Sequence, residues 1–319
     1  MGEDFDLSII IVSWNVCELL RACLEAVLAE PLRQEVLVVD NASSDGTVAM
    51  VQERFPQARV IANAENLGFT GGNNQGIRGS RGCYVLILNP DTRPQPGALS
   101  AMLALMEAHP DAAAVGPELL WPDGSVQSSR RRFPTLVTGL LESTLMQQYW
   151  RDNRVLRRYY CQDLPTDQPQ AVDWVVGACI MLRRAALDQV GLFDEGYFMY
   201  SDELDWCFRA KRTGWQVYHL PQAKVVHYHG KSSEQNLLAR ELRFQDSKLR
   251  FFGKHYGRWQ AQLLRLFLLG TYGVELTALS TKMLVSRHNL AGRRARRDLL
   301  AGALRWQLAR LVGRDPGAV

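Results

Sequence analysis

The chain has 319 residues, which is enough for one large α/β domain with additions or for two smaller domains. Apolar residues make up 47% and charged residues 22%, values ordinary for a soluble protein, and the formal net charge is +4. Basic residues are concentrated in the C-terminal part of the chain, from residue 282 onward. We expect no nucleic-acid partner. The six cysteines form no CxxC pair, which predicts reduced, buried thiols in a cytosolic protein and argues against disulfides and zinc.

Two stretches bear on membrane insertion. The acidic start MGEDFD lacks the basic residues and the apolar core of a signal peptide, and Asp6 does not fit the myristoylation pattern. The most apolar later stretch, residues 263–285, is interrupted by Arg265, Glu275 and Lys282. We therefore expect neither a secretory leader nor a membrane-spanning helix.

Strand and helix patterns alternate at the start of the chain. The apolar run LSIIIV is followed by helically spaced apolar residues, and a second apolar run ends at Asp40. This βαβαβ order implies right-handed crossovers and a parallel sheet. The expected elements are a strand at 7–12, a helix at 18–29, a strand at 36–39, a helix at 47–54 and a strand at 59–62.

The strongest strand signal is YVLILNPD, residues 84–91. A run of apolar and aromatic residues between Gly82 and Pro90 is typical of a parallel strand covered on both faces. Ligands of open parallel sheets bind beyond the carboxyl ends of strands, so Asn89 and Asp91 stand where chemistry is usually placed. A carboxylate there can equally be a helix cap or a turn former.

Later patterns extend the sheet and add helices. Residues 124–160 are irregular and are interpreted as an excursion from the sheet with a helical patch at 136–150. From residue 234 onward the pattern is helical. The other expected elements are helices at 96–108, 184–190 and 201–213, and strands at 112–116, 172–182, 216–219 and 224–229.

Carboxylates and histidines at strand ends are the first candidates for chemistry. Asp40 can accept a hydrogen bond from a ribose hydroxyl or a base N–H, or it can cap a helix. Asp91 beside Asn89 is a hard oxygen ligand suited to Mg²⁺ or Mn²⁺. His227 and His229 alternate on a strand, and each can complete a metal site or be a structural side chain.

An acidic cluster of Asp202, Glu203 and Asp205 opens the helix expected at 201–213. Crowded like charges raise the pKa of a carboxylate, which suits a general base that takes a proton from a hydroxyl. The alternative is a solvated acidic helix start, which the helix dipole favours.

The glycine pattern argues against several nucleotide-binding classes. No glycine-rich phosphate loop follows the first strand, as a nucleotidyltransferase or an NAD-dependent oxidoreductase would require, and no Walker motif occurs. Gly71 and Gly72 open a helix expected to run towards Ile77, and its N-terminus can still hold a phosphate. The arginine run at 130–132 can meet a diphosphate or be a solvated charge run.

Motifs follow one another in a fixed order between about residue 7 and residue 233. They are SWN after the first strand, VVDNASSDGT, NLGFTGGNNQGI, LILNPD, WVVGACIMLRR, FDEGYFMYSDELDWCFR and VVHYHGKSS. Together they resemble the family 2 glycosyltransferases, particularly their rhamnosyltransferase-like bacterial branch. The resemblance implies a GT-A fold, which is an α/β, Rossmann-like fold with a mostly parallel sheet flanked by helices. It also implies a dTDP- or UDP-linked sugar donor, Mg²⁺ or Mn²⁺, and transfer with inversion at the anomeric carbon.

The resemblance also assigns residues to the donor side. By position, Asp40 would hold the uracil or thymine nucleoside, and Ser13, Asn15 and Asn66 would line the same pocket. Asn89 and Asp91 are expected on the donor side as well, and so is Gly71, through the helix N-terminus that can hold a phosphate.

The metal assignment departs from the family pattern at one position. Asp91 takes the place of the last carboxylate of the DxD motif, but Asn89 stands where the family more often has a carboxylate. Asp91 therefore carries the expected cation-binding role. His227 matches the late metal-ligand histidine of the family, and His229 is a second candidate.

The family's acidic pair is usually Glu-Asp, with the second residue as the catalytic base. Here the order is Asp202-Glu203, so position favours Glu203 whereas residue type favours Asp202, and we assign the role to Glu203. The residues expected on the acceptor or sugar side are Trp174, which would stack on a sugar face, Gly177, Ala178 and Asp205.

The expected organisation is a catalytic domain at 1–233 and a basic helical extension at 234–319. The catalytic domain would have a nucleotide-sugar half to about residue 118 and an acceptor half from 119. Residues 260–314 combine apolar and arginine-rich patterns that suit a helix on an anionic bilayer, and a soluble appendage is the alternative.

Taken together, these expectations describe an inverting, metal-dependent hexosyltransferase of cell-wall or polysaccharide biosynthesis. It would move a sugar such as rhamnose to a glycan or lipid-linked glycan. It would be cytoplasmic, or peripheral on the cytoplasmic face of the inner membrane. The alternative function is a non-catalytic protein of the same fold that binds a nucleotide sugar or a glycan.

Overall fold

The computed structural model describes residues 5–142, 144–150, 152–228, 237–285 and 288–314. By its internal contacts the chain divides into two compact units. The first contains Met1–Phe133 and Tyr160–Ser232, and the second contains Pro134–Tyr159 and Ser233–Val319. The division falls close to the expected boundary at residue 233, but residues 134–159, expected within the catalytic part, group with the C-terminal helices.

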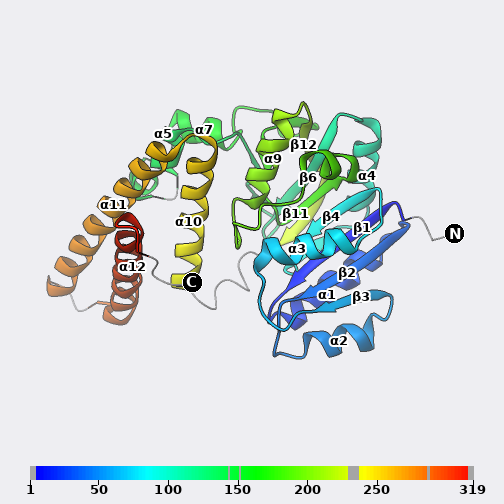
Figure 1. Cartoon of the computed structure of the whole chain (residues 1–319), viewed down its shortest axis with the longest axis horizontal. Helices are drawn as coiled ribbons and strands as arrows, with labels where there is room; N and C mark the ends of the chain where they lie inside the picture. Colours follow the sequence, from blue (N-terminus) through cyan, green and yellow to red (C-terminus); the bar gives the residue numbers. More distant parts are fainter. Residues whose placement is uncertain (1–4, 143, 151, 229–236, 286–287, 315–319) are drawn as a thin grey trace. The chain divides into compact units, whose positions relative to one another are not determined.

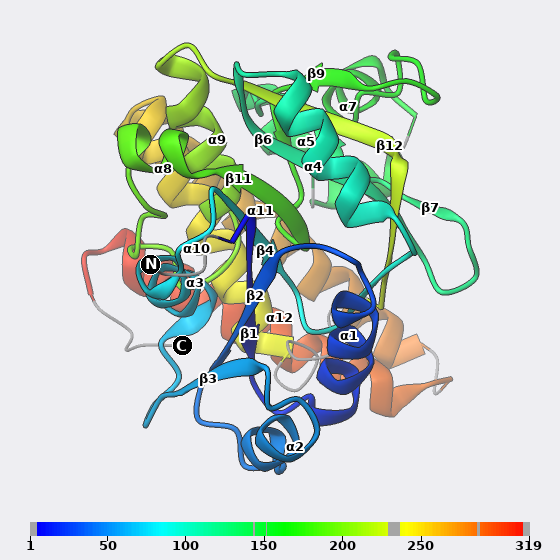
Figure 2. The same cartoon turned by 90° about the vertical axis from the view of Figure 1, so that its right-hand side faces the viewer.

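The first unit is built on one mixed sheet whose main strands lie in the order β3-β2-β1-β4-β11-β6-β12-β5 (Figures 1 and 2). The strands from β3 to β4 are mutually parallel, and β6 is parallel to β12. Strand β11 runs antiparallel between β4 and β6. The bounds are β1 Leu7–Ser13, β2 Gln34–Asp40, β3 Ala58–Ala62, β4 Tyr84–Leu88, β5 Thr92–Pro94, β6 Ala112–Leu120, β11 Cys179–Arg183 and β12 Gln216–His227.

Two short strands pair with this sheet outside its main order. Strand β7 (Val126–Gln127) pairs with β6, and β9 (Gln170–Val172) pairs with β12. Strands β8 (Arg130–Arg131) and β10 (Trp174–Val175) form a separate antiparallel pair. The expected strand at 172–182 is thus three short strands, β9, β10 and β11. The two strands expected at 216–219 and 224–229 are one strand, β12, with a register shift between Leu220 and Lys224.

Helices cover both faces of the parallel strands (Figure 2). Helices α1 (Cys17–Leu28), α2 (Thr47–Arg54) and α4 (Ala98–Ala108) pack on one face. Their apolar side chains share a core with every second residue of β1, including Ile9 and Ile11. This is the arrangement that right-handed βαβ crossovers produce, and it confirms the expected α/β class.

Helix α3 (Gly68–Gly79) covers the opposite face, where two of its glycines allow a close approach to β1. A methyl group on Gly72 would lie 2.9 Å from a Val12 methyl carbon, and one on Gly76 would collide with Ile10. The glycines of this segment therefore bring the helix against the sheet, which explains the composition that the sequence alone left open.

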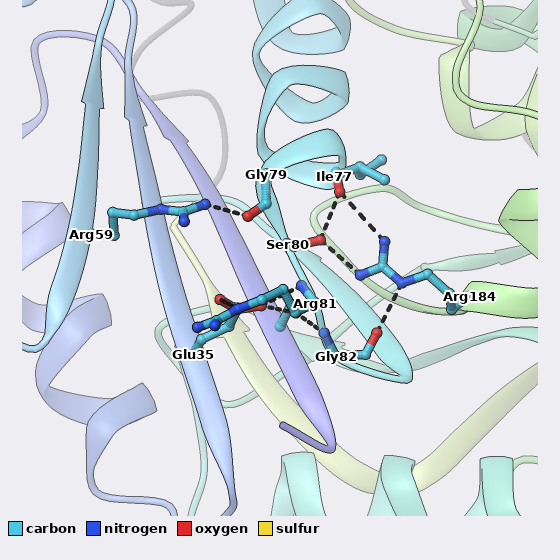
Figure 3. A network of polar contacts seen from close by, with 9 residues as sticks. Glu35, Arg59, Ile77, Gly79, Ser80, Arg81, Gly82 and Arg184 are labelled. Atoms are coloured by element: carbon cyan, nitrogen blue, oxygen red, sulfur yellow. Dashed lines mark hydrogen bonds and ion pairs between the residues drawn. The ribbon is translucent and has the colours of Figure 1, made fainter. Parts of the chain in front are cut away.

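A polar network at the amino-terminal edge of the sheet holds the segment that follows α3 (Figure 3). Ser8 Oγ donates to Glu35 Oε1 at 2.6 Å and accepts from the Gly82 N–H at 2.7 Å. Arg184 donates to the Gly82 carbonyl at 2.9 Å and to Ser80 Oγ at 2.8 Å. These groups lie at the edge opposite the carboxyl ends of β1 and β4, where ligands of such sheets bind. We therefore infer that the network stabilises the fold and does not contact substrate.

The remaining helices of the first unit are α8 (Arg184–Val190) and α9 (Asp202–Arg212). The face of α9 that carries Leu204, Trp206 and Cys207 is buried. Trp206 donates its indole N–H to the Gly191 carbonyl at 2.8 Å, which fixes α9 to the end of α8. This packing sets the position of the acidic residues at the start of α9.

The regular structure in the described residues of the second unit is all helical, and the helices expected from residue 234 onward are present. Its core includes Phe251, Phe252, Leu264, Leu268 and Leu300, which come from the three long helices. Its helices are α5 (Leu136–Leu141), α6 (Leu145–Tyr149), α7 (Arg154–Tyr159), α10 (Leu237–His255), α11 (Arg258–Val285) and α12 (Leu290–Leu311).

Helix α11 differs from the expectation of no membrane-spanning segment. By length and composition it can cross a membrane, because its most apolar 18-residue window has a mean hydropathy of 1.3 and contains at most two charged residues. Only 17% of that window is buried in the protein. A core helix of a soluble protein can pass the same test of length and composition, but such a helix is mostly buried.

Candidate active site

Strands β1 and β2 bring Ser13 and Asp40 side by side at their carboxyl ends. Both residues are buried, and Asp40 Oδ2 accepts a hydrogen bond from the Ser43 N–H at 2.9 Å. Asp40 Oδ1 and Ser13 Oγ have no hydrogen-bond partner among the described residues. Helix α2 has Gly46 as its N-cap residue, so Asp40 does not cap it. Buried polar atoms are nearly always paired, so these two atoms mark a place for a polar ligand.

Asn15 and Asn66, expected in the same pocket, shape the loops around it. Asn15 has a φ of 53°, and its Oδ1 accepts from the Ser44 N–H at 2.8 Å. Asn66 Oδ1 accepts from the Gly68 N–H at 2.9 Å. These contacts give both residues a loop-forming role, and their contact with a nucleoside stays a prediction.

The first turn of α3 does not offer its amide groups to a phosphate. The helix begins at Gly68, before the expected start at Gly71 or Gly72. The Gly68 N–H donates to Asn66, and the N–H groups of Phe69 and Thr70 donate to the Phe198 carbonyl at 2.8 and 3.4 Å. The structure therefore does not support the expected phosphate role of Gly71, because protein acceptors already engage this end of the helix.

The turn after β4 carries Asn89 and Asp91. Strand β4 ends at Leu88, so the expected strand is shorter than residues 84–91. The Asn89 carbonyl accepts from Thr92 Oγ1 at 2.6 Å, which closes the turn. Asn89 Oδ1 is buried without a hydrogen-bond partner in the described part of the chain, and Asp91 is 5% exposed.

Strand β12 ends at His227, and its imidazole faces Asp91. His227 Nε2 lies 3.5 Å from Asp91 Oδ1, and both side chains are nearly fully buried. On the other side of the ring, His227 Nδ1 lies 2.7 Å from Gln127 Oε1. The expected pairing of Asp91 and His227 is therefore present in the fold, although these residues are more than a hundred positions apart.

This pair fits a divalent cation. A distance of 3.5 Å is longer than a normal hydrogen bond but matches two ligands that each lie about 2.1 Å from one ion. No group of three or more His, Cys, Asp or Glu side chains that could hold a metal occurs in the described residues. The remaining ligands would have to come from substrate oxygens or water, as is usual for Mg²⁺. His229 lies outside the described residues.

Asp202 and Glu203 begin α9 behind an unusual backbone turn. Tyr200 and Ser201 both have positive φ, at 67° and 59°, a conformation that is uncommon for residues with side chains and concentrates at functional sites. Asp202 is 2% exposed and its Oδ2 has no hydrogen-bond partner among the described atoms. Glu203 is half-buried.

The two carboxyls differ in how readily they ionise. Burial, reinforced by the charge of Glu203, raises the pKa of Asp202 well above its usual range. Burial also raises the pKa of Glu203, but the Gly177 N–H, which donates to Glu203 Oε1 at 3.2 Å, opposes that rise. The hydrogen bond between the two carboxyls raises the pKa of Asp202 and lowers that of Glu203. Glu203 is therefore the member of the pair that ionises first, as a base requires.

Gly177 and Ala178 connect the acidic pair to the turn after β4. The Asn89 N–H donates to the Ala178 carbonyl at 2.9 Å, and the adjacent Gly177 N–H donates to Glu203. Because β11 pairs with β4 from Cys179 opposite Leu88, this connection follows directly from the sheet register. A continuous run of bonded groups thus joins the carboxylate side of the site to Asn89, two residues before Asp91.

Three expected site residues turn out to be structural. Asp205 is fully buried, with Oδ2 at 2.9 Å from Arg209 Nε, so it is not available to an acceptor. Trp174 is 9% exposed and donates its indole N–H to the Arg132 carbonyl at 3.0 Å, so it does not present the exposed face that stacking on a sugar requires. Arg130 is buried and donates to Gln170 and to the Pro165 carbonyl, rather than facing a diphosphate.

Sequence comparison decides the family. The profile described as "Glycosyl transferase family 2" matches residues 8–191. The chain belongs to glycosyl transferase family 2. The groups described above at the ends of β1, β2 and β4, together with Gly177 and Ala178, lie inside the matched range. This glycosyltransferase has the α/β fold expected from its motifs.

Relatives and solved structures agree with this assignment. An N-acetylglucosaminyl-diphospho-decaprenol L-rhamnosyltransferase of Mycobacterium tuberculosis is 32% identical over 84% of this chain and 88% of its own length. A rhamnosyltransferase of Escherichia coli K12 is 24% identical over 69% of this chain and 82% of its own. A Pyrobaculum calidifontis mannosyltransferase, solved with GDP-mannose and Mn²⁺, superposes with a TM-score of 0.56 at 16% identity and covers 98% of this chain and 88% of its own. The fold of this family 2 enzyme is GT-A.

Two features of the site have no counterpart in the sequence-based expectations. Gln127, which contacts the imidazole of His227, lies on the two-residue strand β7 in a stretch without periodicity. The Phe198 carbonyl, which engages α3, is a backbone group and leaves no mark in the sequence.

Proposed function

We propose that this glycosyltransferase moves a rhamnosyl group from a dTDP- or UDP-linked donor to a hydroxyl of a lipid-linked glycan, with inversion. The observation that carries the proposal is the bonded run from Glu203 through Gly177, Ala178 and Asn89 towards Asp91. This run supports the proposal because it links an acidic base candidate to the turn that carries a cation-binding candidate, at the same edge of one sheet. The choice of sugar and acceptor is supported by the name of the mycobacterial relative, which shares 32% identity over most of both chains.

In the proposed reaction Glu203 accepts the proton of the acceptor hydroxyl as its oxygen attacks the anomeric carbon. The new C–O bond forms on the face opposite the departing phosphate, the anomeric C–O bond breaks, and the nucleoside diphosphate leaves with the bonding electrons. Such general-base assistance contributes about 10²–10⁴-fold in rate. Asp202 holds its own proton and so keeps a second charge out of the buried pair.

The donor would be held at its two ends by different strands. Asp40 Oδ1 and Ser13 Oγ can bond the nucleoside, since both atoms are buried and without a partner in the described structure. Asp91 and His227 would hold Mg²⁺ or Mn²⁺ against the diphosphate. When bound, the cation supplies Lewis-acid stabilisation of the leaving group's charge, which is worth several kcal/mol.

We further propose that the second unit associates with an anionic membrane surface, at the cytoplasmic side where a lipid-linked acceptor would be met. Helix α11 exposes Trp259, Leu266 and Val274 at 64%, 53% and 62%. Helix α12 is rich in arginine. An apolar helix beside a cationic one suits an interface between headgroups and acyl chains.

The membrane proposal is tested by flotation with vesicles. Replacing Leu266 and Val274 by Glu removes apolar surface and adds repulsion, so binding to anionic vesicles should fall by more than 10-fold. A matched control adds the same charge on the first unit through Gln52→Glu and Gln57→Glu, both exposed positions, and should float as the parent does. Unchanged flotation of the α11 variant would refute this proposal.

The catalytic proposal is tested by nucleoside diphosphate release from a panel of donors, with and without Mn²⁺. The acceptor is N-acetylglucosaminyl-diphospho-polyprenol. We expect acceptor-dependent release from a rhamnosyl donor and loss of release on chelation. Tight donor binding with no release from any donor would instead favour the non-catalytic alternative.

A further inference from the structure

Gln127 is a buried amide held against the imidazole of His227. It pairs with Leu119 of β6, and Leu119 also pairs with Val225 of β12, so β6 carries β7 on one edge and β12 on the other. This arrangement brings Gln127 Oε1 to 2.7 Å from His227 Nδ1. The side chain is 7% exposed. A contact of this length between buried groups is a full hydrogen bond.

The chemistry of the two groups fixes the direction of that bond. An amide oxygen only accepts, so His227 must donate its proton from Nδ1. In a neutral imidazole the lone pair then lies on Nε2, the nitrogen that faces Asp91 Oδ1 at 3.5 Å. Two electron-rich atoms that face each other at this distance are compatible with a shared cation.

A second observation separates this role from ordinary packing. The Nε2 amide group of Gln127 is buried and has no hydrogen-bond partner among the described residues. A side chain present only to fill space at this position would be more stable as an apolar residue, because an unpaired buried donor is unfavourable. The oxygen of Gln127 is thus the only polar part of this side chain with an evident use.

We propose that Gln127 is a positioning residue that holds His227 in its Nδ1–H tautomer, with Nε2 and Asp91 directed at one divalent cation. The proposal rests on the metal site of the proposed function and deepens it. Metal-binding histidines commonly donate their second N–H to a carbonyl or carboxylate, and loss of that partner typically weakens metal affinity 10–100-fold.

Mn²⁺ binding in the presence of UDP or dTDP, followed by the electron paramagnetic resonance signal of free Mn²⁺, tests the role without using activity. Gln127→Leu keeps the approximate shape but loses the acceptor, so Mn²⁺ affinity should fall 10–100-fold. Gln127→Glu keeps an acceptor and should stay within about threefold of the parent. The matched control Ser129→Ala removes a buried hydrogen bond from the same segment, to the Pro117 carbonyl, and should also stay within threefold.

The tautomer itself is read from the unmodified protein, which avoids dependence on any variant's folding. Long-range ¹H–¹⁵N correlation spectra, with His227 assigned from the signal lost in His227→Gln, should show protonated Nδ1 and unprotonated Nε2. Parental Mn²⁺ affinity in Gln127→Leu, or an Nε2–H tautomer in the parent, would overturn the inference.

Two further variants separate this inference from the metal site on which it rests. If Asp91→Asn and His227→Gln weaken Mn²⁺ binding while Gln127→Leu does not, only the role of Gln127 fails. If neither Asp91→Asn nor His227→Gln changes Mn²⁺ binding, the proposed metal site itself fails and the inference falls with it.

Discussion

Replacing Asp202 by Asn should stabilise the protein at neutral and alkaline pH. Asp202 is 2% exposed, and burial together with the charge of Glu203 raises its pKa well above the usual range. The folded protein therefore binds this proton more tightly than the unfolded chain does. It follows that the contribution of Asp202 to stability is greatest below the ordinary carboxyl pKa of about 4 and is lost as the pH rises through the raised value.

The magnitude follows from the same linkage. Each unit by which the folded-state pKa exceeds the unfolded one costs about 1.4 kcal/mol once the pH is above both. The amide of Asn carries no charge, so it avoids this cost. For a domain of about 200 residues, each kcal/mol of change in the free energy of unfolding corresponds to roughly 2–4 °C in melting temperature.

The assay is thermal unfolding of the parent and of Asp202→Asn between pH 4 and pH 8.5. We expect the variant to gain stability progressively above the ordinary carboxyl range and to equal the parent near pH 4. Asp188→Asn, which removes an exposed carboxylate on α8, is the matched control and should change little at any pH. A variant that is less stable than the parent at pH 8, or equally stabilised at pH 4, would show that the buried-pair reasoning is mistaken.

The other predictions concern the donor pocket, the amino-terminal edge of the sheet and helix α3. Asp40→Asn should weaken UDP or dTDP binding by about 10–100-fold in calorimetry, because a charged acceptor is lost; unchanged affinity would remove Asp40 from the pocket. Arg184→Met should lower the free energy of unfolding by about 1–3 kcal/mol in denaturant titrations, since its bonds to Gly82 and Ser80 are lost, and should leave nucleotide affinity unchanged. Gly76→Ala should destabilise by about 1–3 kcal/mol, because the added methyl meets Ile10, and a parental melting temperature would contradict the close packing described for α3.

Periodicity predicted the part of the fold that depends on local burial. The apolar runs before Asp40 and Asn89 became β2 and β4, because strands covered on both faces must be apolar throughout. Their order along the chain then placed Ser13 and Asp40 at one edge, and the structure has them in register. The ordered motifs gave the family, which the profile match confirms.

Residues with two plausible uses were harder to predict. Gly71 and Gly72 fit either a phosphate site or close helix packing, and only the position of Val12 and the use of the Phe198 carbonyl decide between them. Asp205 did carry a usable signal, because Arg209 lies four residues later on the same helix face and pairs with it. The same spacing leaves Glu203 on a different face.

Gln127 was not predictable from the chain. Its contact with His227 depends on β6 pairing with β7 on one side and with β12 on the other, and these strands are far apart in sequence. Helix α11 was misjudged for a different reason, because its scattered charges suggested a segment that does not span a membrane whereas its length and mean hydropathy permit a span.

The identity of the base is the central claim of this account, and a single comparison tests it most directly. Initial rates of acceptor-dependent nucleoside diphosphate release are measured for Glu203→Gln and Asp202→Asn, with donor binding followed by calorimetry. We predict that Glu203→Gln loses about 10²–10⁴-fold in kcat with donor affinity preserved, whereas Asp202→Asn stays within about 10-fold of the parent. Near-parental turnover of Glu203→Gln, or a larger loss in Asp202→Asn, would contradict the assignment of Glu203 as the base.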